Sequence, residues 1–200
     1  MKMQKGIAIS LFALLAVLVC VAEPAPATGI VGRTYMNEDY GFQISLPDDL
    51  TKWQITDKTG GFALVVMKGP AGARFQPNVN VLVEILPREL TSKEYFEAGV
   101  KSLRAFIKDF KEESRREVKV GDKDGYELIY TGRMFGIKFK WIQQSVVKGK
   151  YGYIITGTGV PVNFPLQEFR SIMSTFKFLS PSSVASSGKL FTTWAKIKAQ

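Results

Sequence analysis

The sequence contains no histidine and a single cysteine, Cys20, among its 200 residues. Histidine is the usual general base near neutral pH and the commonest metal ligand in proteins. Its absence excludes serine–histidine and cysteine–histidine catalytic sites, as well as histidine-based zinc sites. Because Cys20 has no second cysteine to pair with, an internal disulfide is also excluded, and the packed core must carry the stability.

Acidic residues are few in comparison with basic ones. The chain has 27 lysines and arginines against 18 acids, a formal net charge of +9. The excess is spread along the chain, and a modest basic surface of this kind suits an anionic lipid face or an acidic partner. No nucleic-acid-binding motif is present, so nucleic acid is not expected as a partner.

The N-terminal residues differ in composition from the rest of the chain. Residues 1–5 are basic, and residues 6–22 ("GIAISLFALLAVLVCVA") are almost wholly apolar. A basic start, an apolar run and small residues before a break predict a secretory signal peptide over residues 1–22, cleaved after Ala22. Ala27 ends an alternative cleavage motif. The chain is therefore expected to be extracytoplasmic, in the periplasm or the cell envelope.

Two membrane-anchored alternatives remain open. The apolar run could stay uncleaved as an anchor, although it is short for a spanning helix. Acylation of Cys20 is the other, although Val19 stands where a lipoprotein signal has a small residue. Residues 23–34 are rich in proline and glycine and are predicted to form a linker.

The next part of the chain predicts strands. Residues 40–46 alternate between apolar and polar, which indicates a half-buried strand. Pro47 begins a turn, and residues 50–55 are predicted to form the return strand. Residues 62–68 are apolar on both faces, typical of a strand that is covered on both sides. Residues 78–86 alternate again.

A helix is predicted to begin after Thr91. Thr91 and Glu94 have the spacing of a capping box, in which each side chain satisfies the other residue's backbone amide. Apolar residues then recur at intervals of three and four, which predicts one buried helical face. That face comprises Phe96, Val100, Leu103, Ile107 and Phe110.

From Glu117 the pattern predicts three or four successive strands. Turns are expected at residues 121–125, through Asp124-Gly125, and at residues 132–136 and 149–150. Asn163 is predicted to cap a second amphipathic helix, and residues 176–179 to form a last strand. Six to eight strands, mostly joined by hairpins, and two separated helices predict an α+β sandwich, an antiparallel sheet with helices packed on its faces.

Several stretches, in order, resemble the PsbP family. They are "YMNEDYGFQISLPDDL", "NVNVLVEIL", "TSKEYFEAG", "VGDKDGYELIYTG" and "FRSIMSTFKF", and together they span residues 35–179. The resemblance implies a PsbP-like α/β/α sandwich with a central antiparallel sheet. It places the chain beside extrinsic photosystem II subunits, a Ran-GTPase-binding protein and DcrB-type envelope proteins, which share a fold and a tendency to bind proteins. Fold does not imply function.

The remaining acids offer little chemistry. Asp122, Asp124 and Glu127 superficially resemble a calcium loop, but the segment is half the length that an EF-hand needs. No metal, cofactor or catalytic residue is therefore predicted. The favoured hypothesis is a non-enzymatic protein that binds or stabilises another envelope or membrane-associated protein. A small apolar ligand or lipid carrier is the alternative, and a hydrolase that uses only carboxylates is a third.

Two surfaces are candidates for partner binding. Lys138, Lys140, Lys148 and Lys150 could form one basic face, or else a solvated strand edge. Residues 180–200 are predicted to be a linker and a short amphipathic tail. Its Trp194 could contact a membrane surface or dock on the domain. A protein partner and a peripheral membrane contact are thus both expected.

Overall fold

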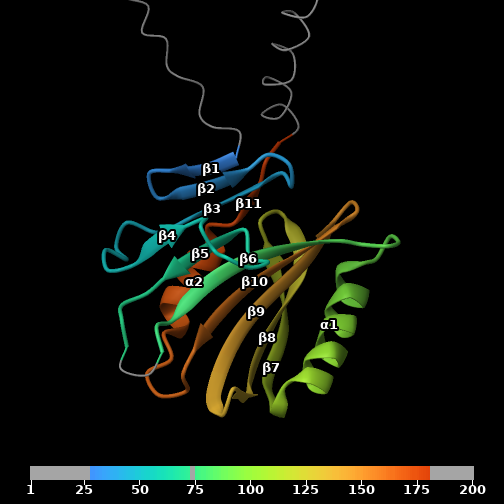
Figure 1. Cartoon of the computed structure of the whole chain (residues 1–200). Helices are drawn as coiled ribbons and strands as arrows, with labels where there is room; N and C mark the ends of the chain where they lie inside the picture. Colours follow the sequence, from blue (N-terminus) through green and yellow to red (C-terminus); the bar gives the residue numbers. More distant parts are fainter. Residues whose placement is uncertain (1–27, 73–74, 181–200) are drawn as a thin grey trace, which may run out of the picture.

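The computed structural model describes residues 28–72 and 75–180 (Figure 1). Within them the chain forms two antiparallel sheets and two helices. The larger sheet has the order β4-β5-β6-β10-β9-β8-β7. Its strands are β4 (Gln54–Thr56), β5 (Val65–Lys68), β6 (Asn78–Ile85), β10 (Tyr151–Gly159), β9 (Ile137–Lys148), β8 (Lys123–Met134) and β7 (Lys108–Val120).

A smaller sheet of four strands joins the two ends of the domain. Its order is β1 (Thr28–Val31), β2 (Thr34–Asn37), β3 (Phe42–Ser45) and β11 (Lys177–Phe178). The predicted linker over residues 23–34 is therefore wrong from Thr28 onward, because this stretch forms a hairpin. Gly32, at φ 59°, supplies the left-handed turn conformation that glycine adopts at little cost.

The predicted return strand is also corrected. Residues 50–55 do not pair with β3. Only Gln54–Thr56 is a strand, and it pairs with β5 in the larger sheet. The turn after Pro47 is instead held by Arg33, whose guanidinium donates to the carbonyl oxygens of Pro47 at 2.7 Å and Leu50 at 3.0 Å. This link turns the chain from one sheet to the other.

The two helices cover opposite faces of the larger sheet, as Figure 1 shows. Helix α1 (Ser92–Phe106) lies over β7, β8 and β9. Its predicted capping box is present, with the Glu94 amide donating to Thr91 Oγ1 at 3.2 Å. Helix α2 (Leu166–Ser174) and the smaller sheet cover the other face. The predicted α/β/α arrangement with a central antiparallel sheet is confirmed.

Three local predictions are wrong. Helix α1 ends at Phe106, and Phe110 belongs to β7, a 13-residue strand that includes the charged stretch before Glu117. Pairing with β8 overrides the helical periodicity there, and charged side chains are typical of an edge strand. Asn163 does not cap α2, because the helix begins after Pro165 without a side-chain cap.

The hairpin between β7 and β8 turns three residues earlier than the predicted Asp124-Gly125. Val120 pairs with Lys123, so Gly121 and Asp122 form the turn rather than Asp124-Gly125. A Cβ atom on Gly125 would lie 2.6 Å from the carbonyl oxygen of Ser145. Gly125 is therefore required by the close approach of β9.

The core lies on both sides of the larger sheet. Under α1, aromatic rings stack in pairs: Phe96 on Tyr126 at 4.9 Å between centroids, and Tyr130 on Trp141 at 5.0 Å. On the other side, Phe42 stacks on Phe176 at 5.3 Å and joins the smaller sheet to the rest of the core. The apolar residues of each side form one continuous cluster.

Truncation of the α1 face tests this arrangement. Phe96 is 3% exposed, so Phe96→Ala is expected to lower the free energy of unfolding by about 3–5 kcal/mol. Lys101 lies on the exposed side of the helix, and Lys101→Ala should cost less than about 0.5 kcal/mol. Chemical denaturation measures both, and equal losses would show that the buried face of α1 is assigned wrongly.

Candidate functional site

The four predicted lysines do not form one face. Lys138 and Lys140 lie near the start of β9, whereas Lys148 ends that strand and Lys150 follows in the turn. Ten residues of extended chain separate Lys138 from Lys148, about 33 Å along a strand. The predicted basic face is therefore corrected to two separate places at opposite ends of the sheet.

Three of these lysines already have partners within the domain. Lys140 forms an ion pair with Glu113 at 2.6 Å. The ammonium of Lys148 lies 4.5 Å from the centre of the Phe178 ring, and that of Lys150 lies 5.3 Å from the centre of Tyr151. Among the four, Lys138 alone borders a cleft. Cys20 and Trp194 lie outside the described residues.

The cleft that Lys138 borders is several times larger than the groove beside α1. It has a volume of about 1300 Å³ and is called the end cleft here, because it lies at the lower end of Figure 1. Parts of the β3–β4 and β5–β6 connections, the β8–β9 hairpin and the β10–α2 connection enclose it. Its apolar walls include Trp53, Pro70, Phe75, Pro77, Ile137, Val160, Pro161, Val162 and Pro165.

The polar groups of the end cleft are few and mostly cationic. Its titratable side chains are Arg133, Lys138 and Glu168. Phe75 is fixed in the wall because its ring packs edge-on against Phe139, with 4.9 Å between the centroids. A cleft with apolar walls and two cations can hold an apolar segment that carries a carboxylate. Sequence periodicity could not identify this site, since its walls come from four separate connections.

The tip of the β8–β9 hairpin stands beside the end cleft and is unusual. Met134, Phe135, Gly136 and Ile137, called the apolar tip here, are all exposed, and Phe135 is 93% exposed. Phe135 has φ 51° and Gly136 has φ 77°. Glycine and asparagine tolerate such a turn, but a bulky aromatic residue there is strained. The fold thus holds an aromatic side chain in water at an energetic cost.

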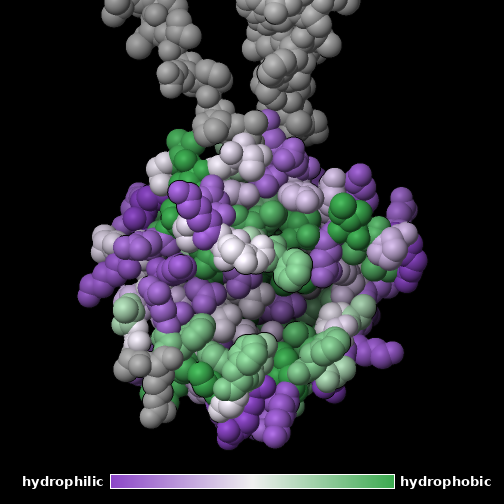
Figure 2. All heavy atoms as spheres, viewed as in Figure 1, coloured by the Kyte–Doolittle hydropathy of each residue, from purple (hydrophilic) through white to green (hydrophobic). Residues whose placement is uncertain are grey.

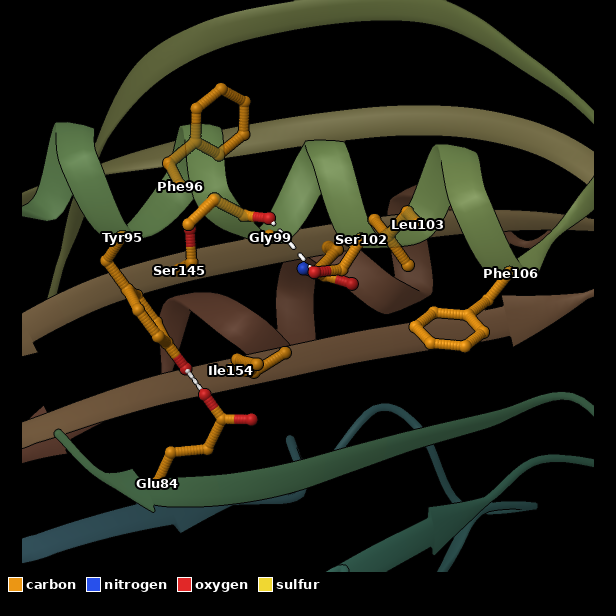
Figure 3. A pocket seen from close by; sticks show the side chains of 11 residues that line it. Glu84, Tyr95, Phe96, Gly99, Ser102, Leu103, Phe106, Ser145 and Ile154 are labelled. Carbon is orange, nitrogen blue, oxygen red and sulfur yellow. Dashed lines mark hydrogen bonds between the residues drawn. The ribbon is translucent and has the colours of Figure 1, made fainter. Parts of the chain in front are cut away.

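A smaller groove of about 300 Å³ runs between α1 and the uncovered part of the sheet. Figure 3 shows Tyr95, Gly99, Ser102 and Phe106 along the helix, with Glu84 of β6 opposite. The Tyr95 hydroxyl donates to Glu84 Oε2 at 2.7 Å. Burial and this hydrogen bond raise the pKa of Tyr95 well above its usual range, so the hydroxyl remains protonated. The pair closes one end of the groove.

The acids of the supposed calcium loop have separate roles. Glu127 is 1% exposed and points toward α2, away from the turn that contains Asp122. It accepts hydrogen bonds from Arg170 at 2.8 Å, Arg116 at 2.9 Å and Gln144 at 3.0 Å. Within residues 28–72 and 75–180, no group of three or more acidic or cysteine side chains is placed to hold a metal ion.

Glu127 is the buried carboxylate that sequence reasoning missed. Burial acts to raise the pKa of Glu127, but the hydrogen bonds from Arg116, Arg170 and Gln144 together outweigh burial and hold the pKa below its usual range. The group therefore stays ionised and links β7, β8, β9 and α2. The alternation of Glu127 with Tyr126 and Leu128 was the only signal that it faces inward.

Acid titration tests the role of Glu127. Its folded pKa is depressed, so its contribution is fully present above the ordinary glutamate pKa of about 4.3 and is lost as pH falls below that value. Glu127→Gln should lower stability at pH 7 by on the order of 2–3 kcal/mol and flatten the loss between about pH 5 and 3. The exposed Glu89 supplies the control, Glu89→Gln, and a matching loss in both variants would contradict the assignment.

The strain at the apolar tip is also measurable. Phe135→Asn removes a bulky residue from the left-handed region without removing buried contacts, so it should raise the free energy of unfolding by about 1 kcal/mol. Phe62 is 92% exposed and does not have a positive φ, so Phe62→Asn should change stability by less than about 0.5 kcal/mol. Thermal unfolding measures the stability of both variants, and a lower stability for Phe135→Asn than for wild type would mean that the tip is not strained.

Comparison by sequence places the chain in no family. It matches no protein-family model and no curated protein. None of the helices in the described residues is long and apolar enough to cross a membrane.

Comparison by structure gives three informative neighbours. LpqN, a protein involved in cell envelope biogenesis of Mycobacterium tuberculosis, has a TM-score of 0.59 at 11% identity, over 76% of this chain and 87% of LpqN. The cyanobacterial PsbP (CyanoP) of Synechocystis sp. PCC 6803 has a TM-score of 0.52 at 13% identity, over 75% and 95%. PA94, a Pseudomonas aeruginosa protein of unknown function, has a TM-score of 0.51 at 17% identity, over 70% and 90%. At these identities the likeness concerns the fold alone, and the chain has a PsbP-like fold.

Proposed function

We propose that this protein is an extracytoplasmic, non-enzymatic binding protein that holds a segment of another envelope protein in its end cleft. The observation that carries the proposal is the composition of that cleft, in which apolar and aromatic walls surround Arg133 and Lys138. An extended or helical segment with apolar side chains and an acidic group fits these walls. The signal-like N-terminus and the fold shared with an envelope protein support the location.

The chemistry of the described side chains supports binding rather than turnover. Catalysis by acids alone would need two carboxyl groups that converge in a cleft. One acid, Glu168, lines the end cleft. One acid, Glu84, lines the smaller groove beside α1, and it already accepts a hydrogen bond from the Tyr95 hydroxyl. Glu127 is committed to two arginines and a glutamine.

A carrier of small apolar ligands is the second candidate. The volume of the end cleft is large enough for a lipid chain, which is the observation in its favour. Against it, the space between the sheet and each helix is filled. Phe96, Leu128 and Trp141 occupy one side, and Phe169, Ile172 and Phe176 the other.

Site-specific photocrosslinking in the native envelope tests the proposal. A photoreactive amino acid at Val162, which is 75% exposed in the cleft wall, should give a protein adduct that mass spectrometry identifies. The same group at Lys101, on the exposed side of α1, should not give that adduct. Lys138→Glu should lower the adduct yield about 5-fold, the factor for roughly 1 kcal/mol of surface attraction.

Two results would overturn this proposal. Equal yields of the same adduct from both positions would show contact by chance rather than binding in the cleft. An adduct that contains only lipid would favour the carrier. Salt adds a further check, because attraction between exposed charges weakens as ionic strength rises.

A further inference from the structure

The lower end of the domain gathers exposed apolar side chains. Eight large apolar side chains are exposed among the described residues, and five of them lie at this end: Phe106, Met134, Phe135, Ile137 and Val162. Phe106 ends α1 two residues before β7 begins, and Val162 shares the end cleft with Ile137. In Figure 2 apolar side chains gather over this lower end, among hydrophilic ones.

Cations stand in one row behind the apolar tip. Lys108 of β7 pairs in register with Arg133 of β8, and Arg133 pairs with Lys138 of β9. Residues paired directly across strands share a face, so three cations, called the cationic row here, lie side by side. Arg133 has one acidic neighbour, Asp109 at 3.2 Å. In the described part of the chain, Lys108 and Lys138 form no ion pair.

This arrangement is costly in the isolated domain. Like charges directly opposite one another in a sheet are destabilising, and the exposed Phe135 is held at a strained φ. Both costs fall on the same hairpin, within the six residues from Arg133 to Lys138. A partner that is apolar in its interior and anionic at its surface would offset both, since the tip would leave water and the row would gain counter-charges.

We propose that the β8–β9 hairpin is a membrane-contacting finger, whose apolar tip enters an anionic lipid surface while the cationic row binds the headgroups. Aromatic and aliphatic side chains flanked by lysine and arginine are the chemistry of interfacial membrane binding. Each cation near an anionic surface contributes on the order of 1 kcal/mol. An acidic protein surface would supply counter-charges to the cationic row, but it would not offer an apolar environment to Met134, Phe135 and Ile137 at the projecting tip.

This inference goes beyond the proposed function and is separable from it. Phe135 and Lys108 do not line the end cleft, and Trp53 and Phe75 are not part of the tip or the row. Substitutions at Phe135 and Lys108 therefore test lipid contact, whereas substitutions at Trp53 and Phe75 test binding in the end cleft.

A local fluorescence measurement on the full chain tests the finger. Phe135→Trp places a reporter at the tip, and Phe62→Trp places one at an equally exposed site in the β4–β5 connection. Each protein is mixed with vesicles of phosphatidylglycerol and phosphatidylcholine, or of phosphatidylcholine alone. The wild-type signal is subtracted, which removes the native tryptophans and any contribution of the terminal segments. The terminal segments are the same in every variant and could themselves contact lipid, so only a reporter at the tip distinguishes lipid contact by the hairpin.

The expected result is specific to the tip and to anionic lipid. The tryptophan introduced by Phe135→Trp should shift its emission to the blue and be quenched by brominated lipid with phosphatidylglycerol vesicles. The one introduced by Phe62→Trp should not respond. Adding Lys108→Glu, which lies outside the end cleft, to Phe135→Trp should weaken the shift, and raised salt should weaken it further. Thermal unfolding confirms that each variant is folded.

Three results would overturn the proposal. They are no shift for Phe135→Trp on anionic vesicles, an equal response from the Phe62→Trp reporter, and an equal response on phosphatidylcholine alone. If the Val162 crosslink persists in Phe135→Asn, the cleft acts without the finger. Loss of the crosslink in Phe75→Ala, with an unchanged lipid response when Phe135→Trp is added to Phe75→Ala, supports the same separation.

Discussion

The structure depends on one constraint, the covering of β8 and β9 on both faces. Phe96 and the stacked pair Tyr130 and Trp141 lie on one side, and the α2 cluster with the smaller sheet lies on the other. Strands buried on both faces lose water from every side chain along their length, which makes the central part of this hairpin rigid. Because the covered part is fixed, the hairpin can extend beyond it and still hold its end in a defined conformation. Strain at Phe135 persists for that reason, since a loosely held turn would relax to an ordinary one.

The buried carboxylate of Glu127 adds directional hydrogen bonds to this apolar packing. Apolar contacts tolerate small slides of a helix over a sheet, whereas hydrogen bonds from Arg116, Arg170 and Gln144 fix α2 at one position. The connection that leads into α2 forms one wall of the end cleft, so the hydrogen bond between Arg170 and Glu127 holds the helix that follows this wall.

The sequence predicted the elements better than their ends or their partners. The capping box at Thr91 and the alternation over residues 40–46 are local signals, and the structure confirms them. The first part of β7, residues 108–116, was missed because its charged residues face solvent at a sheet edge, where pairing with β8 replaces apolar periodicity. The end cleft could not be predicted, since its walls come from connections distant in sequence. The sequence predicted a turn that includes Phe135-Gly136, but no sequence pattern indicates that Phe135 adopts a left-handed backbone conformation.

The smaller sheet has a consequence for how the chain reaches this structure. Thr28 pairs with Asn37, Asn37 with Phe42, and Phe42 with Phe178, so the first and last strands of the domain lie in one row about 14 Å across. The core around Phe42 and Tyr153 is therefore completed only by Phe176 and Phe178, near the end of the domain. Contacts between such distant segments form slowly. During synthesis the growing chain must keep an open apolar face until Phe176 and Phe178 have been added, and in that interval it is a substrate for chaperones and for any machinery that moves unfolded chains.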